Sequence, residues 1–144
     1  MIRAIAAIDI QSGLTRGEGI IWDLPTDKSY FRSKTEYKTI LMGYGEYLAQ
    51  NKVPLPHRRN VVATLRSELL GSGFEKTNDA RAFLKSFTDD IWIIGGAKLY
   101  LETLDLAEEL YITQINKDFN CDKFFPEFRS RFKLFSETEP ITEN

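Results

Sequence analysis

The chain has 144 residues, which suits one domain with a single core and leaves no room for a second catalytic domain. Hydrophobic residues make up 42% of it, enough for a packed interior and too many for a disordered chain. The 19 Lys and Arg residues nearly balance the 21 Asp and Glu residues, so the basic surface of proteins that bind nucleic acid or anionic lipid is not expected. This balance favours a small neutral or anionic ligand.

The chain contains one cysteine, Cys121, and one histidine, His57, which excludes an intrachain disulfide and a zinc site built from several histidines. The apolar run at residues 4–8 is interrupted by Asp9 and is too short for a signal-peptide core or a membrane span. We therefore expect a cytoplasmic monomer with no metal, no nucleic-acid partner and no membrane contact.

Apolar runs and helical segments alternate along the chain. Five short apolar runs predict strands at residues 2–10, 39–42, 61–64, 91–94 and 110–115. Four intervening segments predict helices at residues 26–37, 45–51, 79–87 and 97–104. Pro25 opens the first of these helices, and Asn78 or Asp79 can cap the third. Because parallel strands need crossover connections, we expect a three-layer α/β/α domain with a mostly parallel central sheet and helices on both faces.

The last part of the chain has a different pattern. Residues 116–126 are polar and irregular, whereas residues 131–135 alternate between polar and apolar side chains. Such alternation is typical of an edge or antiparallel strand. We therefore expect one domain over residues 1–144, with an antiparallel edge to the sheet near the C-terminus.

Two turns that contain glycine each connect a predicted strand to a predicted helix. They are Gly95-Gly96 and the segment at residues 42–45. A backbone without a Cβ at a helix N-terminus suits a phosphate group, because free N–H groups and the helix dipole favour an anion there. A Gly-Gly pair alone can equally serve a steric role. Two such turns together indicate a dinucleotide, although neither fits the full GxGxxG fingerprint.

A loop at residues 17–27 precedes the first predicted helix. Its glycines indicate mobility, Trp22 is an apolar anchor, and Asp27 falls in the first helical turn. An acidic residue there is by default a helix-capping or helix-dipole residue. Alternatively, a carboxyl held between apolar walls such as Ile5, Phe31 and Ile94 could handle a proton near neutral pH. With one histidine in the chain, any acid-base step must depend on a carboxyl, a tyrosine or a lysine.

Five sequence elements carry a resemblance to a known family. They are WDLPTD at residues 22–27, LMG at 41–43, LPHRRN at 55–60, IGGAKLY at 94–100 and LYIT at 110–113. In order and spacing they resemble the dihydrofolate reductase family, over nearly the whole chain. The resemblance implies reduction of 7,8-dihydrofolate to 5,6,7,8-tetrahydrofolate by hydride transfer from NADPH, and binding of antifolates.

The resemblance also implies roles for residues around the substrate. Asp27 would hold the pterin ring and govern its protonation, with Thr113 hydrogen-bonding alongside and Trp22 ordering a bridging water. Arg58 would grip the α-carboxylate of the glutamate tail; its alternative is a solvated basic loop. Tyr100 would lie near the nicotinamide. The walls of the pocket would be formed by Ile5, Ala7, Phe31, Leu55 and Ile94.

On the cofactor side, the resemblance makes residues 13–22 a lid over the nicotinamide. Gly95, Gly96 and Ala97 would receive the pyrophosphate. Selection of the 2′-phosphate would fall to Thr64, Arg66 and Lys98. The complete set of implied cofactor contacts is Ala7, Leu14, Gly43, Tyr44, Gly45, Glu46, Thr64, Leu65, Arg66, Gly95, Gly96, Ala97, Lys98, Leu99 and Tyr100.

The chain departs from the family pattern at several positions. Tyr44 and Glu46 stand where a basic residue and a threonine are usual, and Leu65 stands where a small hydroxylated side chain is common. A carboxylate beside a pyrophosphate is repulsive, so we expect weakened cofactor binding. The resemblance further implies a hairpin and one more strand after Asn144, so we expect the C-terminal strand to be absent and a strand edge to be exposed.

Two other functions remain open at this point. Glu46 and the missing strand are compatible with a catalytically weak folate-binding or nucleotide-binding protein. A pyrimidine reductase of riboflavin synthesis would share the fold and the Gly-Gly turn, but is not expected to carry the loop from Trp22 to Asp27.

Overall fold

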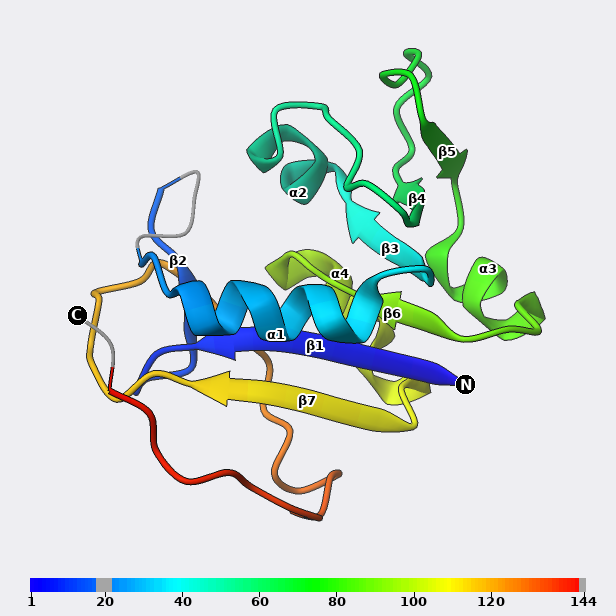
Figure 1. Cartoon of the computed structure of the whole chain (residues 1–144). Helices are drawn as coiled ribbons and strands as arrows, with labels where there is room; N and C mark the ends of the chain where they lie inside the picture. Colours follow the sequence, from blue (N-terminus) through cyan, green and yellow to red (C-terminus); the bar gives the residue numbers. More distant parts are fainter. Residues whose placement is uncertain (18–21, 143–144) are drawn as a thin grey trace.

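A six-stranded parallel sheet forms the centre of the molecule (Figure 1). This computed structural model describes residues 1–17 and 22–142. The six strands are β1 (Ile2–Ile8), β3 (Thr39–Gly43), β4 (Arg59–Ala63), β5 (Phe74–Thr77), β6 (Ile91–Ile93) and β7 (Glu109–Gln114). Their spatial order is β5-β4-β3-β6-β1-β7, and every neighbouring pair is parallel. The predicted parallel α/β sheet is confirmed.

Helices cover both faces of this sheet. On one face lie α1 (Pro25–Thr35) and α2 (Tyr44–Ala49), and α1 lies along β1 in Figure 1. On the other lie α3 (Ala80–Ser86), α4 (Ala97–Thr103) and a 3₁₀ turn, η1 (Leu104–Leu106). This arrangement gives the predicted three layers.

The core is divided into two by the sheet, as strand β3 illustrates. Successive side chains of a strand point to opposite faces. Ile40 and Met42 therefore enter a cluster with Tyr47 of α2, whereas Leu41 enters a second cluster with Leu99 of α4. All five side chains are buried. Strands covered on both faces need continuous apolar runs, which explains why the sequence pattern predicted them correctly.

Helix boundaries differ from the prediction by one or two residues. Helix α1 ends at Thr35 and not at residue 37, where Tyr37 has a left-handed backbone with φ of 64° that a helix cannot continue through. The predicted cap of α3 is confirmed, because the Asp79 side chain accepts a hydrogen bond from the Ala82 amide at 3.0 Å. No helix within residues 1–17 and 22–142 is long and apolar enough to cross a membrane.

Three short strands were not predicted. One is β5, at an edge of the main sheet; the others are β2 (Gly13–Thr15) and β8 (Lys123–Phe124), which form a separate antiparallel pair. Exposed or very short strands do not need an apolar run, so their sequences give little signal.

The predicted antiparallel strand at residues 131–135 is wrong, and the described tail contributes no antiparallel edge to the sheet. The amides of Arg131 and Phe132 both bond to the carbonyl of Phe128, at 3.0 and 2.9 Å, so this stretch begins as a tight turn. Phe132 packs against the core, whereas Phe135 is 99% exposed. The parallel strand β7 therefore forms this edge of the sheet.

A buried carboxylate organises the chain where β1 ends. Asp9 is fully buried and accepts hydrogen bonds from the amides of Gln11 at 2.9 Å, Gly13 at 2.7 Å and Phe119 at 3.0 Å. The Cys121 thiol also donates to it, at 3.5 Å. Asp9 thus ties the turn after β1 to a loop more than 100 residues away, and it explains why β1 stops at Ile8 and not at residue 10.

Candidate active site

The sheet changes its pattern of connections between two adjacent strands, β3 and β6. Strand β3 leads into α2 on one face, whereas β6 leads into α4 on the other. At such a switch point the loops separate and leave a crevice at the carboxyl ends of the strands, where ligands bind in open α/β sheets. The amide of Gly43 donates to the carbonyl of Gly95 at 2.8 Å, so the two turns are joined at the floor of this crevice.

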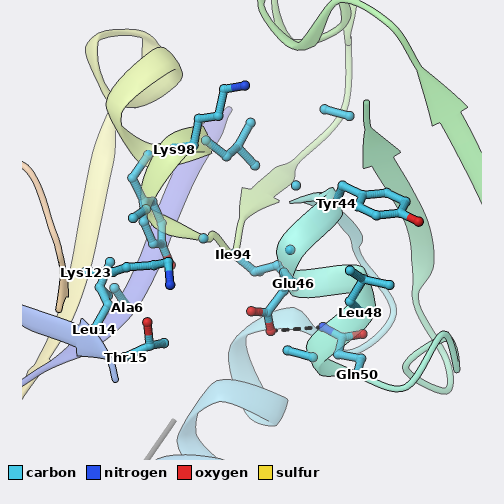
Figure 2. A pocket seen from close by; sticks show the side chains of 18 of the residues that line it. Ala6, Leu14, Thr15, Tyr44, Glu46, Leu48, Gln50, Ile94, Lys98 and Lys123 are labelled. Atoms are coloured by element: carbon cyan, nitrogen blue, oxygen red, sulfur yellow. Dashed lines mark hydrogen bonds between the residues drawn. The ribbon is translucent and has the colours of Figure 1, made fainter. Parts of the chain in front are cut away.

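A large cleft of about 1860 Å³ opens at this point (Figure 2). Most residues that the sequence predicted for substrate or cofactor binding line it. They are Ile5, Ala7, Leu14, Trp22, Asp27, Phe31, Gly43, Tyr44, Gly45, Glu46, Leu55, Thr64, Leu65, Arg66, Ile94, Gly96, Ala97, Lys98, Leu99 and Tyr100. Residues from distant parts of the chain therefore meet in one cavity.

Three predicted site residues do not line this cleft. Thr113, paired with Ala7 in the sheet, lines an adjoining cavity that shares Trp22 and Asp27 with the cleft. Arg58 and Gly95 are not among the residues that line either cavity. Thr113 is therefore close to the Asp27 region. Among the hydrogen bonds of the described residues, none joins the Thr113 and Asp27 side chains.

Arg58 is held at the edge of the apolar wall. Its guanidinium donates to Thr35 Oγ1 at 3.0 Å and to the Pro56 carbonyl at 3.0 Å, and it lies 6.0 Å from the ring of Phe31. Its neighbour Arg59 instead pairs with Glu75 on the outer part of the sheet. The structure therefore separates the two arginines of the basic loop, and only Arg58 adjoins the cleft wall.

Asp27 lies in the first turn of α1, two residues after Pro25 at the start of the helix. A carboxylate in this turn is favoured by the helix dipole, and the fixed φ of proline suits the first helical position. Asp27 is half-buried and borders both cavities. Trp22, at the same junction, packs against Phe119 with ring centroids 5.2 Å apart. Both side chains thus face the space where the sequence predicted a pterin.

The Gly-Gly turn leaves space that a side chain would fill. Gly95 has φ of 104°, and a Cβ there would lie 2.9 Å from the ring of Tyr100. Gly96 and Gly45 border open space instead. The Tyr100 hydroxyl donates to the Ile5 carbonyl at 2.6 Å, and burial raises the pKa of this phenol well above its usual value. Glycine is thus required at residue 95 for packing, while residues 45 and 96 leave backbone open to a ligand.

Glu46, in the first turn of α2, points into the cleft (Figure 2). Its carboxylate accepts a hydrogen bond from Gln50 Nε2 at 3.2 Å. Burial raises the pKa of Glu46, and the hydrogen bond from Gln50 opposes that rise. The sequence predicted a carboxylate in this region but contained no signal that it would be half-buried.

At the outer end of the cleft, Arg66 lies over the ring of Tyr44, 4.3 Å from its centroid. The Tyr44 hydroxyl donates to Glu68 at 2.7 Å, and the Arg66 guanidinium lies 3.6 Å from the same carboxylate. Thr64 Oγ1 accepts a hydrogen bond from the Arg66 amide at 3.1 Å, whereas Leu65 is 86% exposed. Arg66 is therefore a positioned cation at the rim.

Sequence reasoning missed several residues of the cleft, chiefly Lys28, Gln50 and Lys123. Lys123 reaches it from β8 and donates to the carbonyl of Gly17 at 2.8 Å. The amide of Gly17 in turn donates to Asp122 at 2.9 Å. These contacts hold the first part of the predicted lid against β8; residues 18–21 of that lid lie outside the described residues.

This fold and cleft define a class of protein: an α/β protein with a ligand-sized cleft at the switch point of its central parallel sheet. Comparison with known proteins is more specific. The family model for dihydrofolate reductase matches residues 1–144, and the chain belongs to this family.

Individual relatives agree with this assignment. The chain is 32% identical over 142 residues to a dihydrofolate reductase of Bacillus subtilis, covering 96% of this chain and 84% of that protein. It is 35% identical over 132 residues to a type 3 dihydrofolate reductase of Salmonella typhimurium, covering 90% and 81%. A solved dihydrofolate reductase of Enterococcus faecalis, complexed with NADP(H) and RAB-propyl, superposes with a TM-score of 0.83 at 28% identity, covering 90% of this chain and 79% of that one.

Proposed function

We propose that this protein reduces 7,8-dihydrofolate to 5,6,7,8-tetrahydrofolate with NADPH. The observation that carries the proposal is the meeting of Asp27 and Trp22 with the glycine turns in one cleft, in a chain of the dihydrofolate reductase family. When bound, NADPH supplies the hydride. The protein supplies alignment, exclusion of water and control of a proton.

The residues of the cleft suit a dinucleotide. Gly45 and Gly96 border open space where an added side chain would intrude, so backbone can approach a pyrophosphate there. The amide of Gly43 is already bonded to Gly95, so Gly43 supports the turn and does not donate to the ligand. Arg66 is the cation placed for a 2′-phosphate, because a guanidinium binds phosphate oxygens in a forked geometry.

On the substrate side, Asp27 holds the pterin ring and supports protonation of its reacting nitrogen. Ile5, Phe31 and Ile94 form apolar walls that exclude water and strengthen this polar contact. The Tyr100 hydroxyl already donates its one hydrogen bond to the Ile5 carbonyl, so it offers a bound ligand only its ring and its oxygen lone pairs.

The test is absorbance at the NADPH band, with and without dihydrofolate, repeated with NADH. Oxidation that needs dihydrofolate and prefers NADPH is the expected result. Normal cofactor binding without oxidation would favour the folate-binding or nucleotide-binding alternative. Failure to be retained on an antifolate column, together with reduction of a pyrimidine, would favour a pyrimidine reductase.

We also infer a cytoplasmic monomer. The one cysteine, Cys121, is hydrogen-bonded to Asp9, and burial together with the charge of Asp9 raises the pKa of its thiol to about 11. A thiol that stays protonated at neutral pH is a poor nucleophile, so a disulfide between two copies is not favoured.

Replacing Arg58 by leucine tests the proposed grip on the glutamate tail. Arg58→Leu keeps an apolar contact with Phe31 but removes the cation, so antifolates that carry a glutamate should bind more weakly by roughly 1.5–3 kcal/mol. Antifolates without a glutamate should be almost unaffected. Inhibition constants for both kinds of compound provide the measurement.

Arg59→Leu is the matched control, because Arg59 pairs with Glu75 away from the cleft. It should leave both inhibition constants close to those of the parent protein. Equal weakening of the two kinds of antifolate by Arg58→Leu would show that Arg58 is structural.

Replacing Glu46 by threonine tests its expected repulsion of the cofactor. Glu46→Thr removes a charge and restores a hydroxyl donor, so NADPH should bind more tightly by about 1 kcal/mol, or roughly fivefold. The gain should be largest at low salt, where screening is weakest. A salt titration of the NADPH dissociation constant measures it; an unchanged or weaker affinity throughout would show that the carboxylate does not face the bound cofactor.

A further inference from the structure

Glu46 is a carboxyl that the proposed reaction does not use. It points into the cleft from α2, next to the turn that the proposed function assigns to the cofactor pyrophosphate (Figure 2). An ionised carboxyl there opposes an anionic ligand, whereas a protonated one does not. The protonation state of Glu46 should therefore matter to binding.

The surroundings of Glu46 contain several charged or titratable groups but no partner for a negative charge. The cleft into which Glu46 points is also lined by Asp27 and Lys28 of α1, Lys98 and Tyr100 of α4, Arg66 at the rim and Lys123 of β8. Among the ion pairs of the described residues, none involves Glu46. Arg66 lies near Glu68 and Lys123 donates to Gly17, so both of these cations already have other partners.

The one described hydrogen-bond partner of Glu46 is Gln50, one helical turn further along the chain. Gln50 Nε2 donates to the carboxylate, but Gln50 Oε1 is buried and has no hydrogen-bond partner in the described structure. A buried polar atom without a partner is uncommon and costs free energy. This acceptor faces no donor while Glu46 is ionised.

Protonation of Glu46 would supply the missing donor. A carboxylic acid has one O–H donor and keeps acceptor capacity, so an acid and a primary amide can form two parallel hydrogen bonds. Once the Gln50 amide turns so that Oε1 also faces the carboxyl, Glu46 would donate to Gln50 Oε1 and still accept from Gln50 Nε2. Burial also favours the neutral form, since it raises the pKa of Glu46. Both the packing and the partner therefore accommodate neutral Glu46.

We propose that Glu46 takes up a proton from solvent when the anionic cofactor binds, so that cofactor affinity is linked to pH. The proton ends on a Glu46 carboxyl oxygen and bonds to Gln50 Oε1. This inference depends on the proposed placement of the cofactor beside α2. On this proposal, NADPH binds most tightly when the Glu46 carboxyl is protonated, so Glu46 links cofactor affinity to pH and does not only repel the cofactor.

Linkage gives the sign of the effect. If binding adds a proton, affinity is greatest at low pH and falls as the pH rises through the Glu46 titration, by up to about tenfold per pH unit. Glu46→Gln cannot ionise and has nearly the same shape. It should lose this dependence and bind NADPH more tightly than the parent protein at the alkaline end.

The test is isothermal titration calorimetry of NADPH binding at pH 7.5, in two buffers with different ionisation enthalpies. Because the 2′-phosphate of NADPH can exchange protons in every variant, the difference in proton uptake between the parent protein and Glu46→Gln isolates the contribution of Glu46. We expect the parent protein to take up more protons than Glu46→Gln, by up to about one per NADPH. Glu102→Gln, which removes an exposed carboxyl at the rim, should behave like the parent protein.

The ¹³C resonance of the Glu46 carboxyl in the parent protein is a second readout that needs no variant. The pH at which this carboxyl titrates should rise when NADPH is added. Equal proton uptake in parent and Glu46→Gln, or a titration that NADPH does not move, would overturn the inference while leaving the proposed function intact. Absence of NADPH binding in both proteins would overturn the proposed function as well.

Discussion

At pH 7 the Asp27→Asn variant should reduce dihydrofolate about 10²–10⁴ times more slowly than the parent protein, the usual contribution of a positioned acid-base group. Asparagine keeps the shape of the side chain at the junction of the two cavities but cannot hold a proton in the same way. The loss should become smaller at acidic pH, where the substrate arrives already protonated. Single-turnover rates across a pH series measure both effects.

Asp23→Asn is the matched control for this prediction. Asp23 lies just before α1, but its side chain is 78% exposed and pairs with Lys28 at 2.6 Å. Its replacement should leave the rate close to that of the parent protein. If Asp27→Asn also turned over at the parental rate at pH 7, its assignment as the catalytic carboxyl would be wrong.

The second large effect concerns stability and the buried carboxylate of Asp9. Asp9→Ala would leave the amides of Gln11, Gly13 and Phe119 without their acceptor; the Gly13 bond is buried, the other two are partly buried, and a buried donor without a partner costs about 1–3 kcal/mol. The free energy of unfolding should therefore fall by about 3 kcal/mol or more. Asp9→Asn retains one acceptor oxygen and should lose less. Urea denaturation of both variants measures the difference.

The same carboxylate should make stability depend on pH. Burial alone would raise the pKa of Asp9, but the amides of Phe119, Gly13 and Gln11 outweigh it and hold the pKa below its usual value. A lowered pKa contributes stability that is fully present above the unfolded pKa of about 3.9 and is lost as pH falls through the folded pKa. The parent protein should thus lose stability below about pH 4 more steeply than Asp9→Asn.

Asp118→Ala is the control for Asp9, because Asp118 lies in the distant loop that Asp9 contacts through the Phe119 amide, but is exposed and accepts only from the Asn120 amide among the described bonds. Asp118→Ala should change the free energy of unfolding only slightly and should leave the loss of stability below about pH 4 unchanged. A parental unfolding free energy for Asp9→Ala would mean that the three amides find other acceptors.

The sequence predicted the inner part of the sheet well for a physical reason. A strand such as β1 needs apolar side chains on both faces, and this requirement leaves a continuous run that can be recognised. Strand β5 has the sequence FEKT and lies at an edge of the sheet, where charged side chains can be exposed to solvent. It therefore has no continuous apolar run that could be recognised. Residues 131–135 carry an alternating pattern, but alternation specifies a strand only where a neighbour can accept its hydrogen bonds.

The residues of the candidate site can likewise be divided into those that the sequence could locate and those that it could not. Glycine turns, Trp22 and Asp27 could be located because strand-to-helix junctions of a parallel sheet meet at one edge. The burial of Glu46 and the approach of Lys123 could not, because they depend on how α2 and β8 pack against segments far away in the chain. Local sequence carries no record of such contacts.

The position of β1 between β6 and β7 has a consequence for how the chain folds. Ile2 pairs with Ile91 and Ile8 with Gln114, so β1 can gain its neighbours only after about 100 further residues have been made. At roughly 5–20 residues per second, synthesis keeps this Ile- and Ala-rich segment unpaired for on the order of 5–20 seconds. Contacts of such long sequence separation also slow the folding step itself. The strand of the sheet that is made first is thus the one exposed longest to aggregation, and protein yield should respond to chaperones that hold nascent chains.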